Sequence, residues 1–179
     1  MKPKKEAKNY TDTFQHEYHS PLSIEMQSIG VVHSPFKERF TAPRQPDLAT
    51  PAKGCIELND GQNFEQALSD LDSFTHIWVI YWMHLNQGWN PTVMPPRGSD
   101  IRRGLFSTRA PHRPNSIGLS SVTLTSIKKR TLFIEGLDML DGTPVLDIKP
   151  YLPYADSIQG ASHGWLDPSA PFTFSSTCK

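Results

Sequence analysis

Apolar and β-branched residues occur along this chain in short runs, separated by turns rich in proline and glycine. Runs of this length bounded by turn residues are typical of β-strands. The longest run, from Phe74 to Leu85, is apolar on both faces and predicts a buried central strand. We expect further strands over residues 28–33, 54–58, 104–108, 119–127, 131–140 and 144–148. The turn Asp141-Gly142 predicts that the last two form a hairpin.

One segment has the periodicity of a helix instead. Apolar residues between Phe64 and Leu71 recur on one helical face, and Asn63 is positioned to cap the helix, with Gln66 three residues later. Strands that do not alternate with helices indicate a mainly β fold. We expect a small antiparallel β-barrel with one short helix and long loops at its rim.

The length of 179 residues suits one domain with tails. Residues 1–22 are polar and rich in lysine, which predicts a flexible tail. Residues 23–157 are expected to form the barrel domain. Residues 158–179 are expected to form a C-terminal tail whose aromatic residues, Trp165 among them, can dock on the barrel.

The segment 104–120 concentrates cationic side chains between prolines. Arg109, His112 and Arg113 lie within five residues, and a proline stands on either side of the last two. Proline restricts its own backbone and that of the residue before it, so the loop should be stiff. Cations on a stiff loop suit the binding of a carboxylate or phosphate, because little side-chain freedom remains to be lost. A solvated surface turn is the alternative.

Charge is balanced overall but uneven along the chain. The formal net charge is zero and the isoelectric point is about 7.1, so the whole molecule does not attract nucleic acid. Residues 97–130 hold eight lysines or arginines and one acidic residue, a local charge of +7. This run predicts either a basic surface for RNA or another anion, or basic residues scattered over different faces.

Several common protein classes lack their motifs here. The chain has no Gly-x-Gly-x-x-Gly fingerprint, no Gly-Lys-Ser/Thr phosphate loop and no Gly-x-Ser-x-Gly elbow. Dehydrogenases, P-loop enzymes, α/β hydrolases and doubly wound methyltransferases therefore lose support. The two cysteines are too few for a Cys/His zinc site, so we expect no metal.

The same cysteine count bears on the cell compartment. Two cysteines form no disulfide framework, and no secretory signal precedes them, so we expect a cytoplasmic protein. No apolar run approaches the roughly 18 residues of a membrane span, so we expect no membrane association.

Two acidic residues interrupt apolar stretches near the predicted hairpin. Asp138 is in phase with the apolar residues of its strand, and Asp147 stands between Leu146 and Ile148. A carboxylate among apolar neighbours needs a partner, most naturally an arginine or a ligand hydroxyl.

Three segments together resemble the signature segments of the TsaA-like (TrmO) family. They are residues 29–46, residues 140–153 and the run Gly104-Leu-Phe-Ser-Thr-Arg-Ala-Pro-His-Arg-Pro-Asn-Ser-Ile-Gly118. The resemblance implies a β-barrel methyltransferase that uses S-adenosylmethionine and acts as a homodimer. It implies a tRNA substrate, methylated on N6 of the threonylcarbamoyl-adenosine that follows the anticodon.

The resemblance also implies roles for particular residues. Cofactor contacts fall on Pro43, Arg44, Gln45, His84, Leu85, Arg109, Leu119, Glu135, Gly136, Leu137 and Asp138. Substrate contacts fall on His112, Arg113, Asp141 and Lys149. Asp147 is our candidate to receive the proton of the exocyclic amine, with Tyr151 second. A structural role, in which its carboxylate pins the loop to an arginine, is the alternative for Asp147.

One residue departs from the family pattern, because Ser116 stands where members often have proline. Some bacterial members also carry a further C-terminal domain thought to assist tRNA handling. Two other functions therefore remain open. One is methyl transfer to another small molecule or nucleobase, and the other is a non-catalytic regulator that binds RNA or a ligand.

Overall fold

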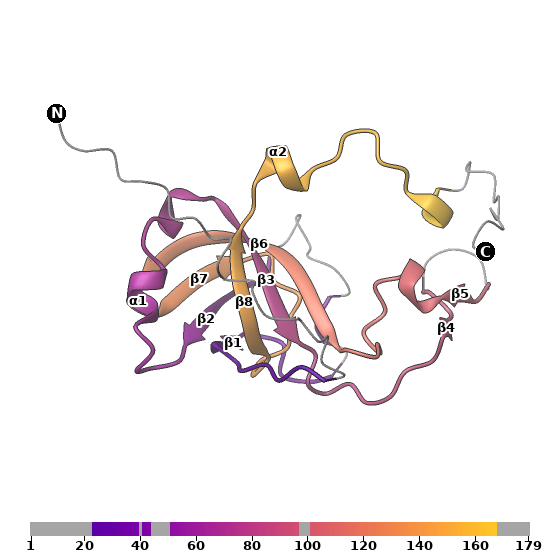
Figure 1. The fold of residues 1–179 in the computed structure, drawn as a ribbon, viewed down its shortest axis with the longest axis horizontal. Coiled ribbons are helices and arrows are strands. Elements are labelled where there is room, and N and C mark those ends of the chain that lie inside the picture. Colours follow the sequence, from indigo (N-terminus) through magenta and orange to yellow (C-terminus); the bar gives the residue numbers. More distant parts are fainter. Residues whose placement is uncertain (1–22, 40, 44–50, 97–100, 168–179) are drawn as a thin grey trace, which may run out of the picture.

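A closed antiparallel β-barrel forms the body of the protein (Figure 1). The computed structural model describes residues 23–39, 41–43, 51–96 and 101–167; the predicted N-terminal tail lies outside them. In this part of the chain, the barrel strands follow the order β1-β2-β7-β6-β3-β8, and β8 pairs with β1 to close the ring. Their bounds are β1 Gly30–His33, β2 Lys53–Leu58, β3 His76–Trp82, β6 Ile117–Lys128, β7 Thr131–Glu135 and β8 Pro144–Pro150. The mainly β barrel expected from the sequence is confirmed.

The period of two along each strand decides which residues fill the barrel. In β3, Ile77, Val79 and Tyr81 are buried, whereas the residues between them point outward. The core is completed by Val32, Ile56, Leu58, Leu68, Val122, Leu124, Leu132, Ile134, Leu137, Met139 and Val145. The expectation that this strand is buried on both faces is wrong, because Trp82 is 51% exposed on the outer wall. An antiparallel barrel covers only one face of each strand.

The predicted helix is a single turn, α1 (Phe64–Ala67), followed by the 3₁₀ turn η2 (Leu71–Ser73). Asn63 does not cap the backbone: it has a left-handed φ of 54°, and its side-chain amide donates to Gln66 Oε1 at 2.7 Å. A second left-handed residue, Asp70, separates the two turns. A further single-turn helix, α2 (Pro153–Asp156), follows the barrel.

The predicted hairpin between residues 131–140 and 144–148 is wrong. β7 ends at Glu135, and Gly136, with a φ of 77°, redirects the chain across the end of the barrel. β8 then pairs with β1 and β3 rather than with β7. The turn at Asp141-Gly142 exists, but a turn motif fixes the local backbone and not the partner strand.

Residues 83–116 leave the barrel between β3 and β6, and we call this segment the side lobe (Figure 1). It contains the two-residue strands β4 (Thr92–Val93) and β5 (Arg103–Gly104), which pair with each other. The predicted strand 104–108 is wrong, because residues 105–107 form the 3₁₀ turn η3 (Leu105–Ser107).

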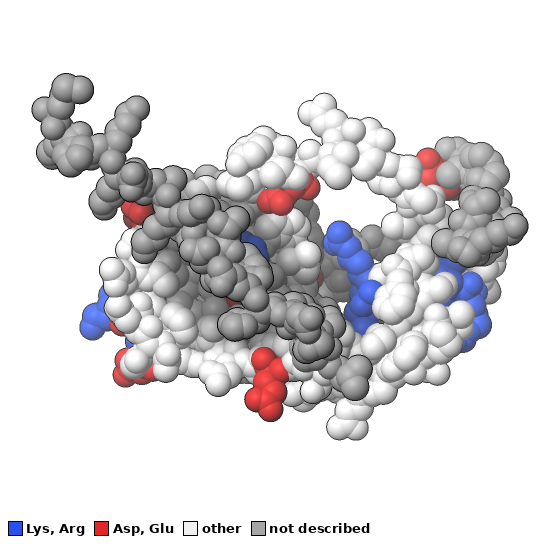
Figure 2. Space-filling model, viewed as in Figure 1, with Lys and Arg blue, Asp and Glu red and all other residues white. Residues whose placement is uncertain are grey.

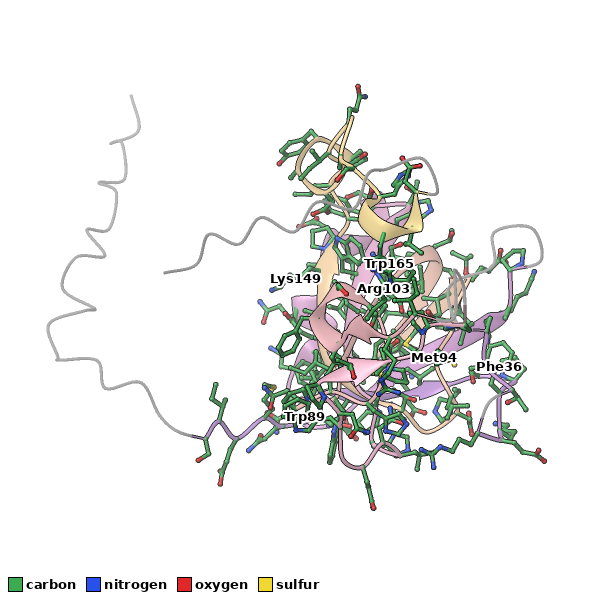
Figure 3. The ribbon with its side chains drawn as sticks, turned by 90° about the vertical axis from the view of Figure 1, so that its right-hand side faces the viewer. Phe36, Trp89, Met94, Arg103, Lys149 and Trp165 are labelled. Atoms are coloured by element: carbon green, nitrogen blue, oxygen red, sulfur yellow. The ribbon has the colours of Figure 1, made fainter. Side chains whose placement is uncertain are left out.

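The chain beyond α2 returns to the side lobe and contacts it through Trp165. This residue lies in the 3₁₀ turn η4 (Gly164–Leu166). Its indole N–H donates to the carbonyl oxygen of Ser107 at 2.7 Å, and the Arg103 guanidinium lies 5.2 Å from the ring centroid (Figure 3). The C-terminal segment therefore fastens the lobe from outside.

Two adjacent residues of β7 test which side chains of the strand face the barrel core and which face outward. Leu132 is fully buried, whereas Phe133 is 40% exposed. We expect Leu132→Ala to lower the free energy of unfolding by about 2–5 kcal/mol, because it leaves a cavity in the core. Phe133→Ala should cost about 1 kcal/mol or less. Urea unfolding followed by circular dichroism measures both, and equal losses would contradict the register.

Candidate functional site

One end of the barrel gathers most of the residues expected to bind the cofactor. We call this end the loop rim. It is formed by the ends of β1, β3 and β7 and by the starts of β2, β6 and β8. Loops 34–52, 83–116 and 136–143 leave from this rim. The opposite end, which carries the turn between β6 and β7, is called the far rim.

A half-buried carboxylate lies at the centre of the loop rim. Asp138 follows the redirected backbone at Gly136, and its Oδ1 accepts a 2.6 Å hydrogen bond from the Ser120 hydroxyl. Ser120 Oγ also lies 3.2 Å from the Tyr81 hydroxyl. Because the Ser120 proton is directed at Asp138, Tyr81 is the donor to Ser120. Two buried hydroxyls thus form a chain of hydrogen bonds that ends on Asp138.

Burial raises the pKa of Asp138 above its ordinary value, while the Ser120 hydrogen bond and the positive charge of Arg109 lower it. Burial also raises the pKa of Tyr81 to about 12, with a further contribution from the charge of Asp138. Tyr81 is therefore protonated at neutral pH and remains a donor. The chain of hydroxyls keeps the Asp138 carboxylate oriented, and Asp138 remains a strong acceptor for a ligand.

Gly118 makes room for this arrangement. A Cβ at this position would lie 2.2 Å from ring atoms of Tyr81, so only glycine lets the ring lie against β6. Sequence reasoning did not identify Gly118, Ser120 or Tyr81. The available signal was a small and a polar residue two positions apart, Gly118 and Ser120, which share the inward face of β6 with Val122 and Leu124.

Arg109 stands at the edge of the same site, on a loop that is internally braced. The Thr108 hydroxyl donates to the carbonyl oxygen of Leu105 at 2.8 Å. Arg113 donates to the carbonyl oxygens of Thr108 at 3.0 Å and Ala110 at 3.4 Å, so its guanidinium holds the loop backbone. Within the described residues, the Arg109 guanidinium itself has no hydrogen-bond or ion-pair partner, so it is available to a ligand.

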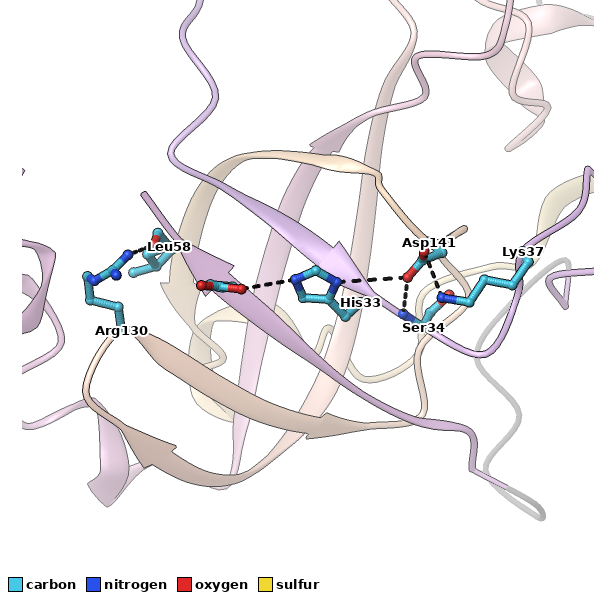
Figure 4. Close-up of polar contacts among 7 residues, drawn as sticks. His33, Ser34, Lys37, Leu58, Arg130 and Asp141 are labelled. Atoms are coloured by element: carbon cyan, nitrogen blue, oxygen red, sulfur yellow. Dashed lines mark hydrogen bonds and ion pairs between the residues drawn. The ribbon is translucent and has the colours of Figure 1, made fainter. Parts of the chain in front are cut away.

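Asp141 connects the two loops on the other side of the rim. Its carboxylate accepts from the Ser34 backbone N–H at 2.9 Å and contacts the Lys37 ammonium at 2.7 Å (Figure 4). His33 lies 4.0 Å away and also contacts Glu57 at 3.2 Å. The hydrogen bond from Lys37 is the largest effect that holds the pKa of Asp141 below its usual value. This carboxylate fastens the segment that leads to Pro43; Arg44 and Gln45 lie outside the described residues.

Other predicted site residues lie around this centre. His84 and Leu85 lie two and three residues after the end of β3, and Leu85 is 47% exposed. Glu135 forms an ion pair with Lys53 at 3.1 Å, where β7 and β2 meet the loop rim. Leu137 is buried in the core beside Asp138.

The barrel wall separates a second group of predicted residues from Asp138. Leu119 and Asp147 both pair with Ile80, on the outward-facing side of β3. Asp147 contacts the Lys149 ammonium at 2.7 Å, and its Oδ1 accepts from the Ile148 N–H. Its partner is thus a lysine rather than the arginine considered above.

Tyr151 lies at the far rim. Its backbone N–H donates to the carbonyl oxygen of His76 at 3.0 Å, and its ring lies 5.4 Å from that of Trp78. Within one chain, the structure therefore does not bring Tyr151 together with Asp138 and Arg109.

The basic run of residues 97–130 is divided by the fold. Arg102, Arg103, Arg109 and Arg113 belong to the side lobe. Lys128 and its neighbours lie at the far rim, at the other end of the twelve-residue strand β6. In the view of Figure 2, Lys and Arg atoms gather over the lobe half of the molecule. The lobe is therefore a basic surface beside the loop rim.

Two absences hold for the part of the chain that the structure describes. No helix there has the length and hydrophobicity that a membrane crossing requires. No group of three or more His, Cys, Asp or Glu side chains there is arranged to hold a metal ion.

The barrel with its polar rim defines a known class of protein. The family model described as tRNA-methyltransferase O N-terminal domain matches residues 31–157. The chain is 44% identical over 156 residues to the tRNA (adenine(37)-N6)-methyltransferase of Escherichia coli. This alignment covers 83% of this chain and 66% of that protein. A crystal structure of TrmO from Pseudomonas aeruginosa superposes with a TM-score of 0.69 at 40% identity, covering 84% of this chain and 66% of that one. The chain belongs to the TrmO family.

Another relative is described by its ligand. A probable S-adenosyl-L-methionine-binding protein of Archaeoglobus fulgidus is 39% identical over 150 residues, covering 84% of this chain and 40% of that protein. The part of the E. coli relative that this chain matches is slightly under two thirds of that protein's length.

The two rim carboxylates predict opposite effects of pH on stability. The pKa of Asp141 is lowered by folding, so its ionised form stabilises the fold above the ordinary carboxyl pKa of about 3.9. This stabilisation is lost as the pH falls through the folded-state pKa. The pKa of Asp138 is raised, so ionised Asp138 opposes folding at neutral pH, and the cost vanishes below the ordinary pKa.

Replacing each carboxylate by an amide tests whether its ionised form stabilises or destabilises the fold. At pH 7, Asp141→Asn should lower the free energy of unfolding by up to about 1 kcal/mol. Asp138→Asn should raise it, while keeping an acceptor for Ser120. Both differences should shrink towards pH 3 in urea titrations. A destabilised Asp138→Asn at pH 7 would show that the carboxylate is a structural anchor.

Proposed function

We propose that this chain is an S-adenosylmethionine-dependent methyltransferase whose cofactor binds at the loop rim between Asp138 and Arg109. One observation carries the proposal: a half-buried carboxylate, oriented by Ser120, lies near an arginine that has no hydrogen-bond or ion-pair partner among the described residues. The cofactor has ribose hydroxyls that can donate hydrogen bonds to an aspartate, and a carboxylate that an arginine can bind. The names of the relatives support this choice of ligand.

The proposal also includes the other cofactor contacts expected from the sequence. They are Pro43, Arg44, Gln45, His84, Leu85, Leu119, Glu135, Gly136 and Leu137. On the substrate side, the proposal includes contacts from His112, Arg113, Asp141 and Lys149. For Arg113 and Asp141, this contact would come in addition to the loop-fastening bonds described above.

The proposed reaction is methylation of N6 of the adenosine that follows the anticodon of tRNA. S-adenosylmethionine supplies the methyl group from its sulfonium. The protein contributes mainly by positioning the two reactants in line, which removes much of the entropic barrier. The exocyclic amine must lose a proton, and Asp147, with Tyr151 second, is the proposed acceptor. A substrate of this kind implies a cytoplasmic protein.

A homodimer would explain how proposed site residues on two different surfaces of the barrel can act at one site. Asp147 and Leu119 lie on the outer wall, whereas Asp138 and Arg109 lie at the loop rim. The same wall exposes Trp82 (51%), which pairs with Ile117. Exposed apolar side chains next to one another favour a protein interface. We therefore place the partner subunit on this wall, so that Leu119 and Asp147 of one subunit approach the loop rim of the other.

Arg109→Ala tests the cofactor site. Loss of a charge-assisted contact should weaken S-adenosylmethionine binding by at least about tenfold in calorimetry. Arg102→Ala is the matched control, because Arg102 lies on the same lobe but donates to Thr92. Unchanged binding by the Arg109 variant would refute the assignment.

The methyl acceptor is tested with the wild-type protein. Incubation with bulk tRNA and labelled cofactor, followed by nucleoside mass spectrometry, should show a methylated N6 position next to the anticodon. Cofactor binding without tRNA modification would favour another acceptor. Absence of cofactor binding would favour a non-catalytic regulator.

Trp82→Glu tests the dimer. A charge on the apolar wall should convert the wild-type dimer to a monomer in analytical ultracentrifugation, with the barrel's circular dichroism unchanged. Phe133→Glu serves as the control, because Phe133 is an outward-facing residue of β7, away from this wall. A monomeric wild type, or a dimeric Trp82 variant, would contradict the placement.

A further inference from the structure

A cavity of about 460 Å³ opens in the side lobe. One wall is the loop that follows β3, with Gln87, Gly88, Trp89 and Asn90. The other is His112, on the loop that carries Arg109 and Arg113, which we call the arginine loop. Asn86 donates to the carbonyl oxygen of Pro111 at 3.5 Å, a long hydrogen bond that joins the two walls. Trp89 is 50% exposed and lies well apart from the Trp165–Arg103 contact (Figure 3).

The side chains of this cavity have the chemistry of a ligand site. They are a flat indole, two carboxamides and an imidazole. Within the described part of the chain, Gln87, Trp89, Asn90 and His112 form no hydrogen bond or ion pair with other residues. No described residue therefore competes with a ligand for the donors and acceptors of these side chains. No acidic residue lines the cavity, which disfavours a cationic ligand.

This set of groups matches a nucleobase better than a sugar or a lipid. An indole offers a face for stacking an unpaired base, and each stacked base contributes substantially to RNA affinity. A carboxamide pairs a donor with an acceptor and so matches the adjacent N6 donor and N7 acceptor of adenine. Arg113 directly follows His112 in the sequence, which places a cation of the substrate side near the cavity for a phosphate.

We propose that this cavity receives an unstacked purine base of the RNA substrate, stacked on Trp89 and read by Gln87 and Asn90. The inference rests on the proposed function, since it supplies the substrate side of the site whose cofactor side is Asp138 and Arg109. The cofactor also carries an adenine ring, so the test must separate the two sources of a purine.

Binding of RNA to the variants tests the proposal without requiring catalysis. The probes are a stem–loop RNA with one unpaired adenosine in its loop and the same RNA with an abasic site there, measured by fluorescence anisotropy. The wild type should bind the adenosine RNA about tenfold more tightly, a factor that corresponds to about 1.4 kcal/mol. Trp89→Ala should bind both RNAs alike, and Trp89→Phe should recover most of the discrimination.

Tyr154→Ala is the control, because Tyr154 is an exposed aromatic residue on α2. It should discriminate like the wild type. Cofactor affinity, measured by calorimetry, should be the same in Trp89→Ala and the wild type. Weaker cofactor binding by Trp89→Ala would assign the cavity to the cofactor and overturn the proposal. Equal discrimination by Trp89→Ala and the wild type would overturn it as well.

The cavity and the proposed reaction can fail separately. If the RNA discrimination depends on Trp89 but no methyl transfer is found, the base site stands and the reaction is wrong. If methyl transfer occurs but Trp89→Ala leaves the KM for tRNA unchanged, the reaction stands and the base site is wrong.

Discussion

The hydrogen bond from Ser120 to Asp138 is the interaction on which the proposed functional site depends. A carboxylate partly removed from water is unfavourable unless donors compensate it, and here a buried hydroxyl pair supplies part of that compensation. The pKa of Asp138 nevertheless remains raised, so the compensation is incomplete. Groups whose pKa values are perturbed in this way are concentrated at functional sites.

The barrel architecture creates this interaction from ordinary strand geometry. The period of two in β3 and β6 turns Tyr81 and Ser120 inward. Gly118 leaves space for the Tyr81 ring, and Gly136 turns the chain so that Asp138 meets Ser120. None of these residues is unusual alone. Their effect comes from strands that are far apart in sequence and paired in the closed sheet.

The side lobe carries Arg109, the cationic half of the proposed site, and the lobe is held by contacts from several directions. Arg113 and Thr108 brace the arginine loop from within, whereas Trp165 fastens the lobe from the C-terminal segment. The family match ends at residue 157, so the Trp165 contact belongs to the part of this chain beyond the shared domain. The placement of Arg109 therefore depends on residues well outside the motif that contains it.

The sequence was informative where local patterns carry the information. Short apolar runs predicted the barrel strands, and the proline-bounded arginines predicted the braced loop. Pairing was not predictable in the same way: an Asp-Gly turn is compatible with a hairpin, yet β8 closes the barrel against β1. The role of Ser120 was missed for the same reason, because its importance comes from Asp138 on a distant segment. The strand pattern identified Asp138 only as a carboxylate that needed a partner, and its expected role as a cofactor contact came from the family resemblance.

The most direct test of this account is the affinity of the Ser120→Ala variant for S-adenosylmethionine, measured by calorimetry beside a Ser121→Ala control. Ser120 does not need to touch the ligand, so it affects binding only by orienting Asp138. The account predicts binding about tenfold weaker than that of the control, with the barrel intact by circular dichroism. Equal affinities of the two variants would contradict it.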